Sequence, residues 1–279
     1  EKEKITVGTC AHNEEETIGE LLDRLIEESI SFTEIIVVVA GDDATASIVE
    51  ERKERYGDIE LIEEKTRRGQ TAAQNKIFER STGDLLILLD GDGLIKSGSI
   101  EELLNRYEKG KIVQGREIPL TEDTFFGSVI DTLWDFHDYV CRQEPKFTTQ
   151  LGLIPAELAE EIPEDIVLDD EFLLKRAIEK GYNSEYAPQA IKYHHTPTDL
   201  KFYFNQRRKN WAGKLQLGSS DRNYLGRRTV FLFNYFRKVD LREKFLVIIM
   251  SVLELSALIF AFRDHIRSDH PVIWYRGSS

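Results

Sequence analysis

Short blocks of apolar residues alternate with helical periods through the first third of the chain. The block at 35–39 holds five consecutive β-branched residues, which is typical of a strand covered on both faces. Before it, apolar residues at 18, 21, 22, 25 and 26 have the spacing of an amphipathic helix. Strands that alternate with helices predict a sheet with crossover helices. We therefore expect an α/β fold with a mainly parallel sheet.

The same pattern predicts individual elements along most of the chain. Strands are expected at 4–8, 34–40, 59–63, 85–89, 112–116 and 182–191. Helices are expected at 14–27, 46–56, 69–81, 99–109, 168–180 and 200–217. The stretch 119–163 has few clear periods and receives no element, while two apolar clusters beyond 229 predict helices. We expect a sheet domain over residues 1–217 and a helical extension over 218–279.

Composition excludes several classes of protein. Of the 279 residues, 41% are hydrophobic, so the chain can bury a full core and is neither disordered nor fibrous. The formal net charge of −13 disfavours nucleic acid, and we expect no nucleic-acid partner. Its two cysteines form no Cys-x-x-Cys pair for zinc or redox chemistry. The first residues lack an export pattern, so we expect a cytoplasmic protein.

The long apolar run at 245–262 has alternative roles. It spans 18 residues, is interrupted by Ser251, Glu254 and Ser256, and lies at the lower limit of length for crossing a bilayer. A charge near the centre of a span costs about 2.5–3.5 kcal/mol. We favour a helix that closes the core or forms a homodimer interface. Because basic residues flank the run, peripheral binding to the cytoplasmic membrane face stays open, and a spanning helix is less favoured.

Polar loops follow three of the predicted strands. They are residues 9–14, residues 40–45 and Asp90-Gly91-Asp92. Because ligands of parallel α/β sheets bind outside the carboxyl ends of the strands, these loops should face one crevice. Two carboxylates separated by one residue can hold a hard divalent cation such as Mg²⁺ or Mn²⁺. Taken singly, each loop is also explained as a tight turn or a helix cap.

Together, the motifs resemble the nucleotide-diphospho-sugar glycosyltransferases of family 2, which have the GT-A fold. Besides the three loops, the resemblance is carried by Arg67, Arg68, Gly69, Ala73, Asn75, Gly83 and Asp84. It runs across most of residues 4–217. It implies a Rossmann-like central sheet flanked by helices, and an inverting, metal-dependent transfer of a sugar from a nucleotide diphosphate to an acceptor hydroxyl.

The resemblance assigns roles to particular residues. The residues that would bind the donor are Thr9, Ala11, Asn13, Glu14, Asp42, Asp43, Arg68, Gly69, Asn75, Asp90, Gly91, Gln206, Arg207, Arg208 and Trp211. The last four resemble the Gln-x-x-Arg-Trp motif of processive and membrane-linked members. With Gln206 aligned, one residue is inserted before Trp211, and with Trp211 aligned, Arg207 and Asn210 replace Gln and Arg, which leaves processivity open. The ligands of the Mg²⁺ or Mn²⁺ ion would be Asp90, Asp92, His194 and His195.

The resemblance also implies a general base. The acids at 169–171 are followed by Arg176 and Gly181 at the offsets of the family's Glu-Asp motif, whose second acid deprotonates the acceptor. Asp170 takes that place. Glu164-Asp165 matches the dipeptide more literally but lacks the residues that follow it. Without the resemblance, acids in the first turn of a helix are explained by capping.

The donor and acceptor are less well defined. Family frequency favours a UDP-sugar, with a GDP-sugar as the alternative, and the acceptor would be a sugar or a lipid-linked molecule. Two other functions stay open. A nucleotidyltransferase that makes nucleotide sugars would normally carry a Gly-rich, basic loop after the first strand, which residues 9–14 lack. The third alternative is a noncatalytic protein that binds nucleotide sugars.

Overall fold

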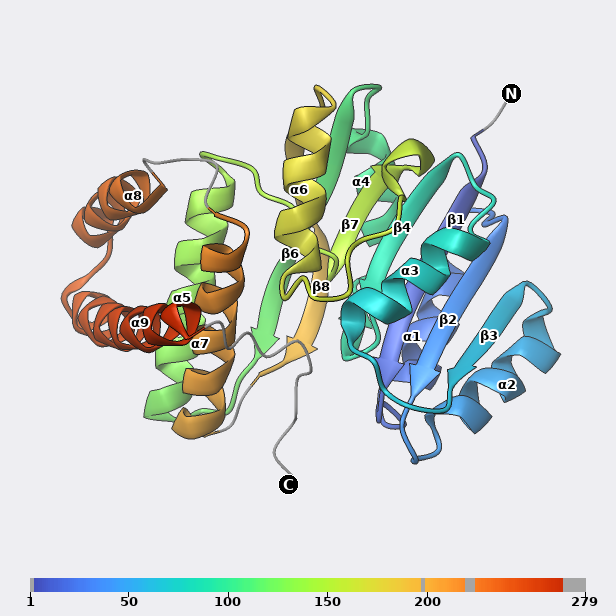
Figure 1. Cartoon of the computed structure of the whole chain (residues 1–279), viewed down its shortest axis with the longest axis horizontal. Coiled ribbons are helices and arrows are strands. Elements are labelled where there is room, and N and C mark those ends of the chain that lie inside the picture. The colour runs from blue at the N-terminus through green and yellow to red at the C-terminus, as the bar shows by residue number, and fades with distance from the viewer. Residues whose placement is uncertain (1–2, 197–198, 219–223, 268–279) are drawn as a thin grey trace. The chain divides into compact units, whose positions relative to one another are not determined.

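The computed structural model describes residues 3–196, 199–218 and 224–267 (Figure 1). The chain divides into two compact units. Unit 1 comprises residues 1–118, 145–164 and 169–194, and unit 2 comprises residues 119–144, 165–168 and 195–279. A domain boundary after residue 217 stays a prediction.

Unit 1 is built on an eight-stranded sheet. Its strands are β1 (Ile5–His12), β2 (Glu34–Ala40), β3 (Ile59–Glu64), β4 (Leu85–Asp90), β5 (Gly93–Ile95), β6 (Lys111–Leu120), β7 (Leu151–Pro155) and β8 (Asn183–His195). They lie in the order β3-β2-β1-β4-β7-β6-β8-β5. The first four strands of this order are parallel, whereas β7 is antiparallel to both β4 and β6. The carboxyl ends of four strands, including Asp90, therefore lie on one edge.

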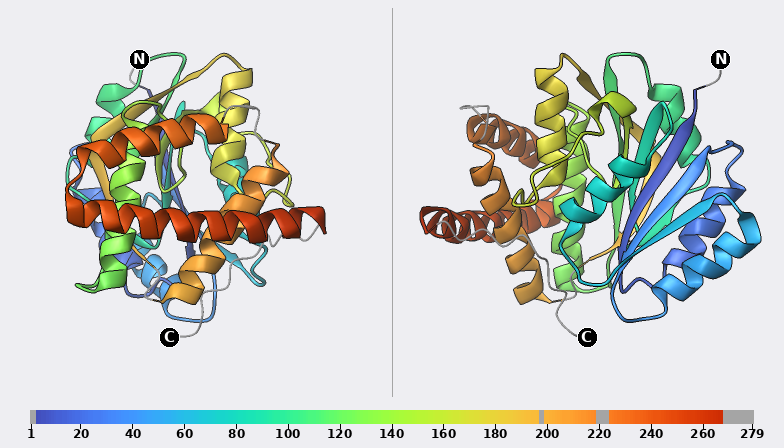
Figure 2. Two further views of the ribbon diagram at one scale, coloured as in Figure 1. Left: turned by 90° about the vertical axis from the view of Figure 1, so that its left-hand side faces the viewer. Right: turned by 45° about the vertical axis from the view of Figure 1, so that its right-hand side comes forward.

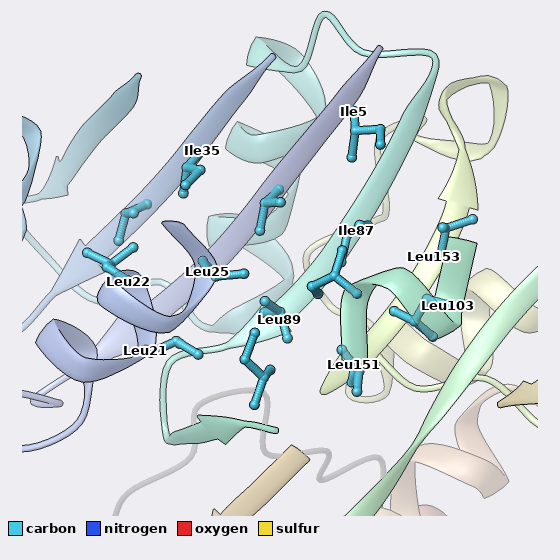
Figure 3. Packing of buried hydrophobic residues seen from close by; sticks show 14 of the residues in the cluster. Ile5, Leu21, Leu22, Leu25, Ile35, Ile87, Leu89, Leu103, Leu151 and Leu153 are labelled. Carbon is cyan, nitrogen blue, oxygen red and sulfur yellow. The ribbon is translucent and has the colours of Figure 1, made fainter. Parts of the chain in front are cut away.

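Helices cover both faces of this sheet (Figure 1). One face carries α1 (Ile18–Glu27), α2 (Thr45–Tyr56) and α4 (Ser99–Arg106), and the other carries α3 (Gln70–Arg80) and α6 (Asp169–Glu179). A short 3₁₀ helix, η1 (Ala156–Leu158), follows β7. Alternate strand residues form the core under the first face. Figure 3 labels its members Ile5, Leu21, Leu22, Leu25, Ile35, Ile87, Leu89, Leu103, Leu151 and Leu153.

Unit 2 is helical in the part of the chain described. It contains α5 (Phe125–Cys141), α7 (Leu200–Gln216), α8 (Tyr224–Lys238) and α9 (Leu241–Ile266). The long helix α9 packs across α5 and α7 (Figure 2). Its buried Leu246, Val247 and Met250 join the apolar residues of α5, and its Ala257 and Ala261 pack with Trp211 of α7. A capping box formed by Asp240 and Glu243 fixes the start of α9.

The predicted α/β class and the helical C-terminal region are confirmed. Each predicted strand and helix is present. The strand at 34–40 has the predicted ends, the other elements have shifted ends, and residues 14–17 lie before α1 rather than in it. The structure adds α5 and β7 in the stretch 119–163, where no element was predicted, and the three-residue strand β5.

Candidate functional site

The acids Asp90 and Asp92 lie at the carboxyl edge of the parallel strands. Buried apolar residues at 85–89 fix β4, and Asp90 is its last residue. Gly91 lies between the two acids and is held against β1. Its N–H donates to the carbonyl oxygen of Cys10 at 2.9 Å. A Cβ on this glycine would lie 2.9 Å from a side chain of β1. The strand and the glycine together anchor the acidic pair against β1.

Side-chain amides surround the carboxylate of Asp90. Nε2 of Gln70 donates to its two oxygens at 3.0 and 3.2 Å, and Nε2 of Gln150 donates to Oδ2 at 2.6 Å. Gln70 begins α3, and Gln150 directly precedes β7. These hydrogen bonds satisfy a buried carboxylate without adding a positive charge.

The carboxylate of Asp92 forms an ion pair with a buried lysine. Lys192 lies in β8 with no side-chain exposure, and its Nζ donates to Oδ1 of Asp92 at 2.7 Å. The same Nζ donates to Oε1 of Gln150 at 2.5 Å. A continuous polar chain therefore runs from Asp92 through Lys192 and Gln150 to Asp90.

Acids outnumber this lysine at the edge of the sheet. Burial raises the pKa of Asp90 well above its usual value; Lys192 opposes this effect, and the charges of Asp92 and Asp169 add to it. Burial also raises the pKa of Glu117 to about 7, against a hydrogen bond with Thr148 and the charge of Lys192. Shifted pKa values of this kind concentrate at functional sites. Ionisation of these acids is unfavourable in the protein alone, so a cation nearby would favour their charged forms.

The first and second polar loops are joined by hydrogen bonds. Asn13, in the left-handed region at φ 56°, accepts a bond from the N–H of Asp42 at 3.2 Å. The N–H of Glu14 donates to the hydroxyl of Thr45 at 2.8 Å. Burial raises the pKa of Asp43, but the hydrogen bonds from Thr45 and from the backbone of Glu15 and of Asp43 itself together lower it to a greater extent, so the net shift is downward. The first two loops, which contain predicted donor-binding residues, therefore do meet.

Residues of β1 behind these loops are buried. Thr9 has no exposed surface, and Ala11 belongs to the apolar core. Burial, together with the charges of Asp90 and Asp169, raises the pKa of the Cys10 thiol well above its usual value. A role of Thr9 or Ala11 in donor binding would therefore fall to the backbone rather than to the side chain.

The predicted donor-binding residues before and within α3 have different surroundings. Arg68 is exposed and donates to both carboxylate oxygens of Glu164, at 2.6 and 2.7 Å. Gly69 caps α3 with a positive φ of 111°. The amide of Asn75 bonds to the backbone N–H and carbonyl of Ile162, each at 2.8 Å. Asn75 thus fixes the segment after η1 and is engaged by the protein itself.

The two acids at the start of α6 differ in exposure. Asp169 is buried, and its charge raises the pKa of both Asp90 and Cys10. Asp170 is half-buried and accepts a hydrogen bond from the N–H of Glu171 at 2.7 Å. Both acids are also favoured by the helix dipole. The structure therefore brings the predicted Glu-Asp motif to the edge that carries Asp90.

The four predicted metal ligands do not form a ready-made metal site. His194 is buried in β8 opposite Gly93, and His195 is exposed. Over residues 3–196, 199–218 and 224–267, no three His, Cys, Asp or Glu side chains are grouped so that they could hold a metal ion. Asp90 and Asp92 lie at the same edge, as the sequence predicted.

The predicted donor residues of α7 lie in unit 2. Arg207 donates to both oxygens of Glu254 in α9, at 2.5 and 3.0 Å, and Nε1 of Trp211 donates to the same carboxylate at 3.1 Å. Arg208 forms an ion pair with Asp264 of α9. Gln206 precedes them in the same helix. In this structure the cations of the motif join α7 to α9.

Sequence reasoning missed the side chains that hold the acids. No family motif includes Gln70, Gln150 or Lys192. The sequence around the two glutamines does not indicate that they bind the acids. Lys192 does give one, because it interrupts the otherwise apolar and aromatic part of β8 at 190–193. A lysine in a strand that is otherwise buried requires a buried partner.

Comparisons with known proteins agree with this geometry. The profile of the family described as "Glycosyl transferase family 2" matches residues 6–156. The chain is 24% identical over 231 residues to the "Probable glycosyltransferase YdaM" of Bacillus subtilis, covering 75% of this chain and 54% of that protein. It is 28% identical over 106 residues to the cholesterol galactosyltransferase of Borreliella burgdorferi, covering 38% of this chain and 29% of that protein.

A solved structure shares the fold. The mannosyltransferase PcManGT from Pyrobaculum calidifontis, in complex with GDP-Man and Mn²⁺, superposes with a TM-score of 0.65 and 18% identity. The match covers 96% of this chain and 88% of that one, and it confirms the predicted GT-A fold. Since the family profile spans more than half of the residues, the chain belongs to glycosyl transferase family 2.

Proposed function

We propose that this protein transfers a sugar from a nucleotide-diphosphate donor to an acceptor hydroxyl. The observation that carries the proposal is the group of acids at the carboxyl edge of the parallel strands, in a chain of this family. Asp90 and Asp92 follow β4, Asp169 begins α6, and the charges of Asp92 and Asp169 both act on Asp90. The joined loops at Asn13 and Asp42 lie at the ends of the neighbouring strands β1 and β2 and would hold the nucleoside.

The chemistry of the acids fits a divalent cation in part. Asp90 and Asp92 offer hard carboxylate oxygens, which Mg²⁺ and Mn²⁺ prefer, and the diphosphate of the donor would supply further oxygen ligands. When bound, such an ion stabilises the charge that develops on the departing nucleoside diphosphate. PcManGT was solved with GDP-Man and Mn²⁺. UDP-sugars and GDP-sugars are therefore both candidate donors for the present chain.

Asp170 is the proposed general base of an inverting transfer. The acceptor oxygen attacks the anomeric carbon opposite the leaving group, its proton passes to the carboxylate of Asp170, and the diphosphate oxygen departs with the electrons of the broken bond. A base must lie within hydrogen-bond reach of an acceptor that enters from solvent. The half-buried Asp170 meets this requirement better than the buried Asp169 does.

Replacing the base tests this mechanism. Asp170→Asn should lower turnover by about 10²–10⁴-fold while leaving donor affinity unchanged. Turnover is measured as the release of UDP or GDP from a panel of donor sugars, with Mn²⁺ and a sugar linked to polyprenyl phosphate, which carries free hydroxyls, as the trial acceptor. Asp169→Asn is the matched control and should have a smaller effect. Turnover of Asp170→Asn at the wild-type rate would remove this residue from the role.

The same assay separates the alternative functions. A nucleotidyltransferase would release pyrophosphate from a nucleoside triphosphate and a sugar phosphate, rather than UDP or GDP from a nucleotide sugar. A noncatalytic binding protein would bind the donor in calorimetry and release no product. Either result would overturn the transferase proposal.

We further propose that unit 2 binds an anionic membrane surface through α9, where a lipid-linked acceptor would be located. By length and composition α9 qualifies as a candidate membrane span, although one such helix is weak evidence. Its more than half-exposed apolar residues recur at alternating intervals of four and three. They are Leu241, Phe245, Ile248, Val252, Leu255, Ile259, Phe262 and Ile266. The opposite side of α9 packs on α5 and α7, which supports a helix lying on the surface rather than across the bilayer.

The charges near the exposed stripe of α9 favour a membrane over a second copy of the chain as its partner. The exposed stripe has Arg242 and Lys244 at one end and Arg263 and Arg267 at the other, and α8 contains four basic residues but no acid. In a self-paired helix these like charges would oppose one another, whereas anionic lipid attracts all of them. The basic ends therefore favour the membrane as the partner.

Flotation with vesicles tests the membrane proposal. The triple variant Val252→Ser, Leu255→Ser and Ile259→Ser should no longer float with vesicles that contain phosphatidylglycerol, whereas the wild type floats. Ile178→Ser, at an exposed apolar position of α6, is the control and should float like the wild type. Unchanged flotation of the triple variant would reject the proposal, as would a wild-type dimer that these substitutions dissociate.

A further inference from the structure

Lys192 places a buried positive charge beside the acidic pair of unit 1. Its side chain has no exposed surface, and its ammonium group contacts Asp92 at 2.7 Å and Gln150 at 2.5 Å. Gln150 in turn donates to Asp90 at 2.6 Å. One buried monocation is therefore bonded directly to one member of the acidic pair and, through a single amide, to the other.

The charge of Lys192 acts on the wider group of acids. It favours the ionised forms of both Asp90 and Glu117, against burial and against the neighbouring carboxylates. A buried acid without a partner is strongly unfavourable, so an internal ammonium allows these acids to be present before any ligand arrives. The ammonium is covalently part of the strand, whereas a divalent cation must shed water to enter.

We propose that Lys192 is an internal counter-ion that competes with the divalent cation for Asp92, so that the protein alone binds the metal weakly and binds it tightly only together with a nucleoside diphosphate. This inference rests on the proposed function, because it takes the donor to be a nucleotide diphosphate. A carboxylate that already accepts a bond from an ammonium has less charge to offer a second cation, and the two cations repel each other. The phosphate oxygens of the donor compensate by supplying negative charge and ligands of their own.

Binding of Mn²⁺ to the full chain, without nucleotide, tests this competition. The electron paramagnetic resonance signal of free Mn²⁺ is followed during titration of the wild type, Lys192→Met and Lys192→Arg. Lys192→Met removes the charge but keeps much of the side-chain volume, and it should bind Mn²⁺ at least tenfold more tightly than the wild type. Lys192→Arg retains the charge and should remain weak. Equal or weaker binding by Lys192→Met would overturn the inference.

Thermal unfolding separates this effect from a loss of structure. In EDTA the melting temperature of Lys192→Met should fall, and Mn²⁺ alone should restore most of it, while the wild type responds little to Mn²⁺. Lys192→Gln keeps a hydrogen-bond donor without the charge and replaces Lys192→Met if that variant does not fold; it too should bind Mn²⁺ more tightly. Arg52→Met breaks the ion pair with Asp23 in α1 and should leave Mn²⁺ binding unchanged.

Addition of UDP or GDP completes the experiment. The nucleotide should tighten Mn²⁺ binding by the wild type by at least tenfold and should narrow its difference from Lys192→Met. If nucleotide leaves the wild-type affinity unchanged, the inference fails. None of these measurements depends on turnover, so a protein that shows the predicted Mn²⁺ behaviour but transfers no sugar would contradict the proposed function alone.

Discussion

Two groups of buried charges, one in each unit, differ in how well they are balanced. In unit 2, Glu254 accepts hydrogen bonds from Arg207 and Trp211. Burial raises the pKa of Glu254, but the charge and hydrogen bonds of Arg207, the charge of Arg228 and the hydrogen bond from Trp211 together lower it to a greater extent, so the net shift is downward. In unit 1 the net shift of Asp90 is upward, because Lys192 offsets only part of the effects of burial and of neighbouring acids.

The difference separates a structural group of charges from a candidate functional one. A buried pair with matched charges joins two helices and requires nothing from outside. A group with excess negative charge is costly in the free protein and gains stability when a cation or a ligand arrives. The acids of unit 1 therefore fit a binding site, whereas the pairs between α7 and α9 primarily hold unit 2 together.

Breaking the balanced group should have the largest effect on stability. Glu254→Ala leaves the largely buried Arg207 without its acid and should lower the free energy of unfolding by about 3 kcal/mol, measured by urea denaturation. The double variant Arg207→Met, Glu254→Leu removes both charges and should be destabilised by less than Glu254→Ala. A loss of under about 1 kcal/mol for Glu254→Ala would show that this pair is not needed for unit 2.

The unbalanced group should instead respond to pH. The pKa of Glu117 is about 7 in the folded chain, against 4.5 as its usual value. The folded state therefore binds more protons between these values, and its contribution to the free energy of unfolding falls by about 3 kcal/mol as pH rises through this range. Glu254 behaves in the opposite sense: its contribution is present above its usual pKa and is lost as pH falls.

Glu117→Gln should remove most of this dependence. Urea unfolding in EDTA, repeated between about pH 4.5 and pH 8, should show a flatter profile for the variant and greater stability than the wild type at the upper end. Glu179→Gln, at an exposed position of α6, is the control and should keep the wild-type profile. A wild-type slope in Glu117→Gln would assign the pH dependence to other groups.

Much of the fold could be predicted because the central strands β2 and β4 are almost purely apolar and helices such as α1 and α4 are amphipathic. The block at 35–39 and the run at 85–89 indicated the parallel core directly. By contrast, α5 contains aromatic and polar residues whose burial depends on α9, more than 100 residues further along the chain. The strand β7 is short and includes Gly152, so local patterns gave little signal of pairing with β4.

The part of the candidate site that could be predicted consists of charged residues at the end of a strand. Asp90 and Asp92 follow a buried strand, and their shared edge was expected from parallel topology. The partners of these acids come from segments that are distant in sequence, so spacing alone could not identify Lys192 or Gln150. In the same way, the predicted donor residue Asn75 bonds to Ile162, a contact between segments 87 residues apart.

The smallest effect on stability is expected at an exposed ion pair, which differs from the two groups compared above because water screens its charges. Arg68 and Glu164 are both exposed, and such pairs contribute about 0–1 kcal/mol, so Arg68→Ala should unfold at nearly the wild-type urea concentration. If Arg68 instead contacts the diphosphate, calorimetry with UDP or GDP and Mn²⁺ should show affinity lower by about 10-fold or more. Glu164→Ala frees the arginine and should not weaken binding. Equal nucleotide affinity in Arg68→Ala and the wild type would exclude Arg68 from the donor site. Its role would then be limited to the surface ion pair with Glu164.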